Sequence, residues 1–291
     1  MSIAMNTDCM ICHIRRSLET AKSLGDSKTA MAFAKELLKL HIAAPEGAGS
    51  PWLGPGTMKL FEQFYGLEAD RFREEKAFSN RFVMERYAEI EAQIQAQPDP
   101  VLAGLKFSIL GNYLDFSALQ GQVSFEKLEQ MLRQALTMDL DMDTYQSLQK
   151  ELTRGKKVLF LTDNAGEIGF DRLFAEQLQK AYPHLEITFC VRGGPIHNDA
   201  TREDAAFVQI PFPVIDSGYA VGGTELSMLS AQAKRAMDNA DVIIAKGMGN
   251  TESLYGCGYP IYYAFMVKCI RFVQQFGKEL FTPMLVREQI Q

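Results

Sequence analysis

Short apolar runs alternate with stretches of helical periodicity through the second half of the chain, and this alternation restricts the fold more than any other feature. The predicted strands are residues 158–161, 187–191, 214–216 and 241–247. The predicted helices between them are residues 166–181, 201–206 and 224–238. Strands separated by helices of this length form βαβ units with parallel strands. The sequence therefore predicts an α/β portion, residues 155–291, built on a mostly parallel, doubly wound sheet with helices on both faces (α/β/α).

The first half of the chain has the periodicity of helices only. Spacings of three and four residues place five apolar residues on one face of a helix, namely Ile11, Ile14, Leu18, Ala21 and Leu24. Further helices are predicted near residues 28–43, 57–66, 69–97, 99–111, 124–137 and 143–153. The segment 45–56 is rich in Pro and Gly, so we expect a loop there. Residues 1–154 are thus predicted to be a helical N-terminal portion that contributes to a substrate pocket.

Composition and charge argue against several classes of protein. The formal net charge is -6, which provides no basic surface of the kind that nucleic acids or anionic membranes require. Residues 1–16 lack the apolar core of a secretory signal, and no apolar run approaches the roughly 18–20 residues that span a bilayer. We therefore expect a cytoplasmic protein without a nucleic-acid or membrane partner. The five cysteines are an odd number in a large chain, which argues against a disulfide framework.

Polar clusters follow three of the predicted strands. The clusters are residues 163–167 (DNAGE), 192–199 (RGGPIHND) and 246–252 (KGMGNTE). Ligands of open α/β sheets bind beyond the carboxyl ends of the strands, which is where these clusters fall. A helix cap or a tight turn explains any one of the clusters, but it explains three together less well.

The residue types in these clusters suit a metal ion and a phosphate group. Asp163 and Asp199 offer carboxylate oxygens and Asn164 an amide oxygen, which are ligands for hard divalent cations. Gly166 opens a predicted helix whose free N–H groups favour an anion, and Lys246 offers a positive charge for a phosphoryl oxygen. A metal and a lysine together can neutralise charge in a phosphoryl-transfer transition state.

Other motifs are absent or open to two interpretations. The chain has neither a Walker A loop nor a G-x-G-x-x-G after a strand. Cys9 and Cys12 share a helix face, but one CxxC cannot complete a zinc site, so a structural role is favoured over a redox or a partial metal-binding role. His197 is either a metal ligand or a surface residue near one.

Three stretches, TDNAGEIGFDRLFAEQL, VRGGPIHNDATREDA and ADVIIAKGMGNTESL, together resemble the signature blocks of the damage-control phosphatase family, also known as domain of unknown function eighty-nine. The chain is similar to the compact, mostly prokaryotic branch of that family, which carries an N-terminal CxxC helix (here CMICHIRRSLETAK) and segments like DRFREEKAFSN and LGNYLDF. The resemblance runs from Cys9 to about Lys268. Thr251 departs from the pattern, in which an aromatic residue is expected.

The resemblance implies a metal-dependent phosphatase that hydrolyses phosphate monoesters of small or damaged phosphometabolites, such as sugar phosphates. The implied metal ligands are Asp163, Asn164 and Asp199, with Asp163, Asp199 and Glu167 as catalytic residues. The expected substrate-binding residues are Gly166, Lys246, Asn198, Arg192, Asn112 and Asp115. The expected cofactor is a divalent ion, Mn²⁺, Mg²⁺, Co²⁺ or Ni²⁺, because oxygen-rich sites accept several such ions.

Two other functions fit the same clusters. The strand ends could hold a sugar phosphate or nucleotide without turning it over, so that ligands stabilise the protein but no phosphate is released. A carboxylate methyltransferase is disfavoured because no glycine-rich cofactor loop follows the first α/β strand. In the absence of an aspartyl-nucleophile motif D-x-D-x-T, we expect direct attack by water. The sequence leaves the oligomeric state open.

Overall fold

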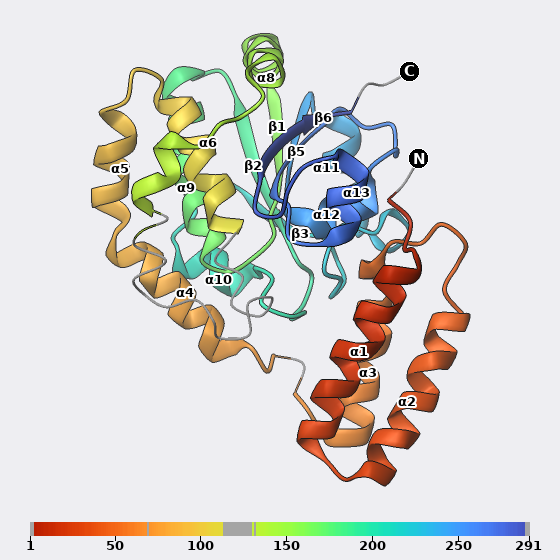
Figure 1. The fold of residues 1–291 in the computed structure, drawn as a ribbon. Helices are drawn as coiled ribbons and strands as arrows, with labels where there is room; N and C mark the ends of the chain where they lie inside the picture. The colour runs from red at the N-terminus through yellow and green to blue at the C-terminus, as the bar shows by residue number, and fades with distance from the viewer. Residues whose placement is uncertain (1–2, 69, 113–129, 131, 289–291) are drawn as a thin grey trace.

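A single mixed sheet organises the molecule (Figure 1). The computed structural model describes residues 3–68, 70–112, 130 and 132–288, and within them six strands pair in the order β3-β2-β1-β4-β5-β6. Their bounds are β1 Lys157–Leu161, β2 Glu186–Val191, β3 Val214–Asp216, β4 Val242–Lys246, β5 Ile261–Met266 and β6 Pro283–Arg287. The first five are parallel, and β6 pairs with β5 in the antiparallel sense. The predicted α/β class and mostly parallel sheet are confirmed.

Strand β1 is buried on both faces. Val158 and Phe160 belong to the hydrophobic core on one face of the sheet, and Leu159 and Leu161 to the core on the other. Successive side chains of a strand point to opposite faces, so a strand covered on both sides needs an uninterrupted apolar run. This explains why VLFL shows no alternation of apolar and polar residues.

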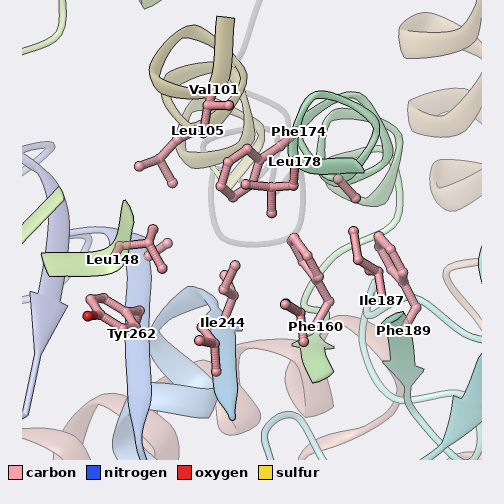
Figure 2. Close-up of a cluster of buried hydrophobic side chains, with 14 of the residues drawn as sticks. Val101, Leu105, Leu148, Phe160, Phe174, Leu178, Ile187, Phe189, Ile244 and Tyr262 are labelled. Carbon is pink, nitrogen blue, oxygen red and sulfur yellow. The ribbon is translucent and has the colours of Figure 1, made fainter. Parts of the chain in front are cut away.

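Helices from both halves of the sequence cover the first face of the sheet (Figure 2). They are α6 (Pro100–Gly111), α8 (Met142–Arg154) and α9 (Glu167–Ala181). Figure 2 shows Leu105 of α6 and Phe174 of α9 above Phe160 and Ile244 of the sheet. Helix α6 approaches α9 closely at Gly104, where a Cβ would lie 3.1 Å from the Cα of Phe174. The N-terminal half therefore supplies part of the cover of the sheet.

The opposite face of the sheet is covered by helices from the C-terminal half alone. These are α11 (Ala231–Asn239), α12 (Gly247–Leu254) and α13 (Ile270–Phe276). Phe265 of β5 and Phe272 of α13 lie edge to face, with ring centroids 5.3 Å apart. Helices on both faces make the sheet doubly wound, as predicted. Helix α10 (Arg202–Phe207) follows β2.

The first three helices form a small unit that extends away from the sheet (Figure 1, red to orange). They are α1 (Thr7–Leu24), α2 (Ser27–Ile42) and α3 (Gly54–Tyr65), and their shared core contains Phe33, Leu37 and Phe61. Helices α4 (Arg73–Glu85) and α5 (Tyr87–Gln95) continue the chain to α6. No helix within the described ranges combines the length and apolar character needed to cross a bilayer.

Three local predictions differ from the structure. The segment 45–56 is only partly a loop, because Ser50–Leu53 is a 3-10 helix and α3 begins at Gly54. Each of these helices has a proline at its first or second position, where a missing N–H breaks no helical bond. The segment 69–97 is two helices, because Arg86 leaves the helical conformation and donates from Nη1 to the carbonyl of Phe82.

The predicted helix 224–238 is likewise wrong at its start. Leu226–Met228 is a 3-10 helix, and α11 begins only at Ala231 because the hydroxyl of Ser230 accepts from the Ala233 N–H and caps it. Half of the predicted helix 124–137 lies outside the described residues; residues 130 and 132–134 are helical, and the end, Ala135–Thr137, is a 3-10 helix.

Candidate metal and phosphate site

The three polar clusters meet at one edge of the sheet. Strand β1 has β2 on one side and β4 on the other, so the direction of the strand order reverses beside β1. Such a switch point creates the crevice in which open α/β sheets bind ligands. The clusters follow the carboxyl ends of β1, β2 and β4, and nearly all of their polar side chains are buried.

Backbone hydrogen bonds join the first two clusters. Asn164 and Asp199 form an isolated antiparallel bridge. The Ala165 N–H donates to the Asn198 carbonyl at 2.8 Å, and the Ala200 N–H to the Asp163 carbonyl at 2.7 Å. Asp163, Asn164 and Asp199 are therefore neighbours, although Asn164 and Asp199 are 35 positions apart in the sequence.

Arg192 links the two aspartates. Its Nε donates to Asp199 Oδ2 at 2.6 Å, and its Nη2 to Asp163 Oδ1 at 3.1 Å. Its Nη1 donates to Asn250 Oδ1 at 3.0 Å, and the side chain is only 1% exposed. A buried guanidinium with three fixed partners holds both carboxylates in place. Arg192, predicted to bind substrate, is thus engaged mainly with the predicted metal ligands.

Two amide groups bind the second oxygen of Asp163 and an oxygen of Glu167. Asn164 Nδ2 donates to Asp163 Oδ2 at 2.9 Å and to Glu167 Oε2 at 2.8 Å. Asn112 Nδ2 donates to the same two oxygens, at 3.0 Å each. A reversed Asn164 amide would place its oxygen against two carboxylates, so the network assigns Oδ1 as the end that can bind a cation.

Lys246 is fully buried behind Glu167. Its Nζ donates to Glu167 Oε1 at 2.7 Å and to the Ser108 carbonyl at 2.8 Å, and it pairs with Asp171 Oδ1 at 2.9 Å. These three partners match the three N–H donors of an ammonium group. The structure places Lys246, which was predicted to lie near the phosphate, in contact with these two buried carboxylates.

Gly166 has a different environment from the one that a free helix N-terminus would offer. Its N–H donates to Asn80 Oδ1 at 2.7 Å, and Asn80 Nδ2 donates to Asp204 Oδ1 at 2.8 Å. The residue has φ 76°, and a Cβ would lie 2.8 Å from that of Ser79. Glycine is required there because an L side chain would be both strained and in contact with α4.

Negative charge dominates the buried site. Four buried carboxylates, Asp163, Glu167, Asp171 and Asp199, face two buried cations, Arg192 and Lys246. With all six groups ionised, two negative charges remain. Burial, Asp199 and Glu167 raise the pKa of Asp163 well above its ordinary value, whereas Arg192 and Lys268 act in the opposite direction. Burial is also the main reason why the pKa of Asp171 is raised to about 6.

A divalent cation fits this donor set. Two surplus negative charges equal the charge of such an ion, and the donors are oxygens of two carboxylates and one amide. Across the described part of the chain, no three His, Cys, Asp or Glu side chains are arranged so that they could hold a metal. The predicted ligands are two carboxylates and one amide, from Asp163, Asp199 and Asn164. The amide oxygen of Asn164 is the third ligand, so no third carboxylate is needed.

The remaining predicted residues lie in different places. Asn198 is buried in the loop between β2 and α10, and Asp115 lies outside the described residues. His197 is exposed, with φ 46° and its ring 6.3 Å from that of Phe72. Cys9 and Cys12 are half-buried on α1, and all five cysteines are free thiols.

Several residues of the site carried no assigned role in the sequence. Asn250 accepts from Arg192 and from the Thr224 hydroxyl, and its Nδ2 donates to the carbonyls of β1 and β4. Lys268 is half-buried after β5, close enough to Asp163 to lower its pKa. A lysine that directly follows an apolar strand is a signal that the sequence did contain. Asn80 and Asp171 lie inside helices and gave no such signal.

Similarity to known proteins covers nearly the whole chain. The model of the damage-control phosphatase ARMT1-like domain matches residues 5–282. A damage-control phosphatase of Archaeoglobus fulgidus is 29% identical over 276 residues, 92% of this chain and 94% of that protein. A damage-control phosphatase of Pyrococcus horikoshii is 35% identical over 168 residues, 57% of each chain. An uncharacterised protein of Methanocaldococcus jannaschii is 29% identical over 300 residues, 98% of this chain and 96% of that one.

A solved structure has the same fold. The crystal structure of a domain of unknown function 89 family protein from Pyrococcus horikoshii matches with a TM-score of 0.82 and 26% identity, covering 98% of this chain and 99% of that chain. The relatives named as phosphatases support a phosphatase role for this chain.

Proposed function

Because this chain belongs to the damage-control phosphatase ARMT1-like family, we propose that it is a metal-dependent phosphatase acting on phosphate monoesters of small phosphometabolites, such as sugar phosphates, damaged ones among them. One observation carries the proposal. Asp163, Asn164 and Asp199 come together at the sheet's switch point, in a buried site with two surplus negative charges. The half-buried Cys9 and Cys12 on α1 also support the compact, CxxC-bearing branch of the family.

Asp163, Asn164 and Asp199 are the residues that would hold the ion, whether Mn²⁺, Mg²⁺, Co²⁺ or Ni²⁺. When bound, a divalent ion supplies charge neutralisation and lowers the pKa of water. Arg192 keeps the carboxylates of Asp163 and Asp199 at a fixed separation by donating to both. Site residues that are locked by packing and hydrogen bonds need little rearrangement during a reaction.

The attacking water is oriented by Asp199 in this proposal. Both oxygens of Glu167 already accept from Lys246, Asn112 and Asn164, so this carboxylate is committed to its neighbours. Asp199 binds Arg192 through Oδ2 and is adjacent to Asn164. Glu167 is completely buried, whereas Asp199 is 5% exposed, so we assign Glu167 to the support of the site and Asp199 to the acceptance of a proton from water.

Lys268 is the cation that we assign to the phosphate group of the substrate. Lys246 is completely buried and the Arg192 side chain is only 1% exposed, so neither cation is accessible to a substrate. Lys268 is partly exposed at the carboxyl end of β5 and lies close to Asp163. A lysine in this position acts as a point charge for a phosphoryl oxygen.

Phosphate release separates this function from non-catalytic binding. The chelator-stripped protein is assayed against sugar phosphates, nucleotides and a chromogenic monoester, each with one of the four ions added. Release that requires an ion and is absent in Asp163→Asn supports the phosphatase. If no ion gives release and sugar phosphates or nucleotides only raise the melting temperature, the protein is a binding protein instead.

A further inference from the structure

A second buried carboxylate lies behind Glu167. Asp171 is four residues further along α9, so both side chains are on the same face of the helix. Both are completely buried. Two carboxylates in this position would repel each other strongly without a shared cation. Lys246, at the end of β4, provides one, at 2.7 Å from Glu167 Oε1 and 2.9 Å from Asp171 Oδ1.

Ser108 of α6 completes the environment of this lysine. Its carbonyl accepts from Lys246 Nζ at 2.8 Å, and its hydroxyl donates to Asp171 Oδ1 at 2.6 Å. The ammonium group therefore has one partner on α6 and two on α9, which together determine its direction. The helices can pack this closely because Gly111 has no side chain; a Cβ there would lie 2.8 Å from the ring of Phe170.

The position of Lys246 determines how Glu167 meets the metal-ligand turn. With Oε1 on Lys246, Oε2 faces the amides of Asn112 and Asn164. One N–H of Asn164 then binds Glu167 and the other binds Asp163. As a result the oxygen of Asn164 is the end of the amide available to a cation. A continuous chain of charged contacts thus runs from Asp171 through Lys246 and Glu167 to Asn164.

We propose that Asp171 is a positioning residue for the metal site, acting through Lys246 and Glu167 to orient the amide oxygen of Asn164. The inference rests on the proposed metal-dependent function and adds a residue that touches neither metal nor substrate. Without the Asp171 carboxylate, Lys246 loses one of its two charged anchors, and Glu167 loses the fixed partner that keeps Oε2 on Asn164.

The test compares two variants on the same helix. Asp171→Asn keeps the shape of the side chain and removes its charge. Glu176→Gln is the matched control, because Glu176 also pairs with a cation, Arg172 at 2.9 Å, but has no link to Glu167. Mn²⁺ affinity is measured by titration calorimetry, and the Mn²⁺-induced rise in melting temperature by calorimetric scanning.

Asp171→Asn is expected to bind Mn²⁺ up to about tenfold more weakly than wild type, the lower end of the effect of losing a direct partner of a metal ligand, because Asp171 acts through Lys246 and Glu167. Its phosphatase activity should recover as Mn²⁺ is raised. Glu176→Gln should bind Mn²⁺ like wild type. Wild-type affinity in a folded Asp171→Asn protein would overturn the inference. A wild-type protein that binds no divalent ion would instead overturn the proposed function.

Ser108→Ala covers the case in which Asp171→Asn does not fold. It removes only the hydroxyl that holds Asp171 Oδ1 and leaves the backbone carbonyl that accepts from Lys246. Mn²⁺ affinity below that of Glu176→Gln supports the positioning role. Affinity equal to that of Glu176→Gln contradicts it.

Discussion

Groups from several elements fix the carboxylate of Asp163. Arg192 donates to Oδ1, and the amides of Asn112 and Asn164 donate to Oδ2. On a further side, Gly247 approaches so closely that a Cβ on it would overlap the carboxylate. A glycine in the KG block thus has a local cause, namely the space that the carboxylate needs.

Gly247→Ala should therefore abolish metal binding and phosphate release. Gly247 has φ 77°, so alanine adds backbone strain of about 1 kcal/mol as well as the overlap with Asp163. Gly66→Ala is the control, because Gly66 has φ 64° with no atom within 4 Å of an added Cβ. Both variants should lose stability in urea unfolding, but only Gly247→Ala should lose Mn²⁺ binding. Equal Mn²⁺ binding in the two would contradict this account of Gly247.

Lys268→Met separates substrate binding from metal binding. Loss of this charge should raise the KM for a phosphate monoester about tenfold or more, because a charged hydrogen bond to the substrate disappears. Mn²⁺ affinity should stay the same or increase, since a positive charge near Asp163 is removed. Steady-state kinetics at saturating Mn²⁺ measure the first effect and calorimetry the second. An unchanged KM would remove Lys268 from the phosphate site.

At the scale of elements, a histidine pair joins the first three helices. The Thr57 hydroxyl donates to the Leu53 carbonyl, so it accepts from His13 Nε2 at 3.2 Å. His13 Nδ1 then accepts from His41 Nε2 at 2.9 Å. This chain requires neutral imidazoles, because a proton on His13 Nδ1 would face the N–H of His41. Burial, His41 and His197 lower the pKa of His13 to about 4.

The pair makes the stability of the protein depend on pH. As pH falls below about 6.5, His13 takes up a proton in the unfolded chain but not in the folded one, until pH approaches 4. The contribution of His13 to the free energy of unfolding is therefore fully present above pH 6.5 and is lost progressively as the pH falls toward 4. Between pH 7 and pH 5, wild type should lose about 1–2 kcal/mol more than His13→Gln in urea unfolding. The exposed His184→Gln should behave like wild type, and parallel curves for all three would contradict the prediction.

The sequence predicted elements best where a single pattern decides them. The four predicted strands are present, and the patterns of β1 and β4 are the clearest because these strands are buried on both faces and are therefore almost entirely apolar. Helix α1 also forms, but only Ile14, Leu18 and Ala21 of its apolar positions pack in the core, while Ile11 is 62% exposed. Periodicity identifies a helix more reliably than it identifies which neighbour the helix contacts.

At the scale of the whole molecule, the sequence predicted where the strands end but not the order of the strands or the helical residues that contact the site. The order β3-β2-β1-β4-β5-β6 depends on long-range pairing, so the switch point beside β1 could not be deduced from local patterns. The same holds for partners such as Asn80, Ser108 and Asp171, which reach the site from helices α4, α6 and α9. Isolated polar residues in helices look like surface residues until the fold buries them.

We propose that the buried charges of the site make the whole molecule depend on a divalent cation at the sheet's switch point. Phosphate release from a chromogenic monoester, measured with chelator-stripped protein before and after addition of Mn²⁺, tests this requirement together with the ligand assignment. We predict no release before addition, release after it, and none at any Mn²⁺ concentration in Asp163→Asn. Equal release with and without the ion, or full Mn²⁺-dependent release in a folded Asp163→Asn protein, would contradict the account.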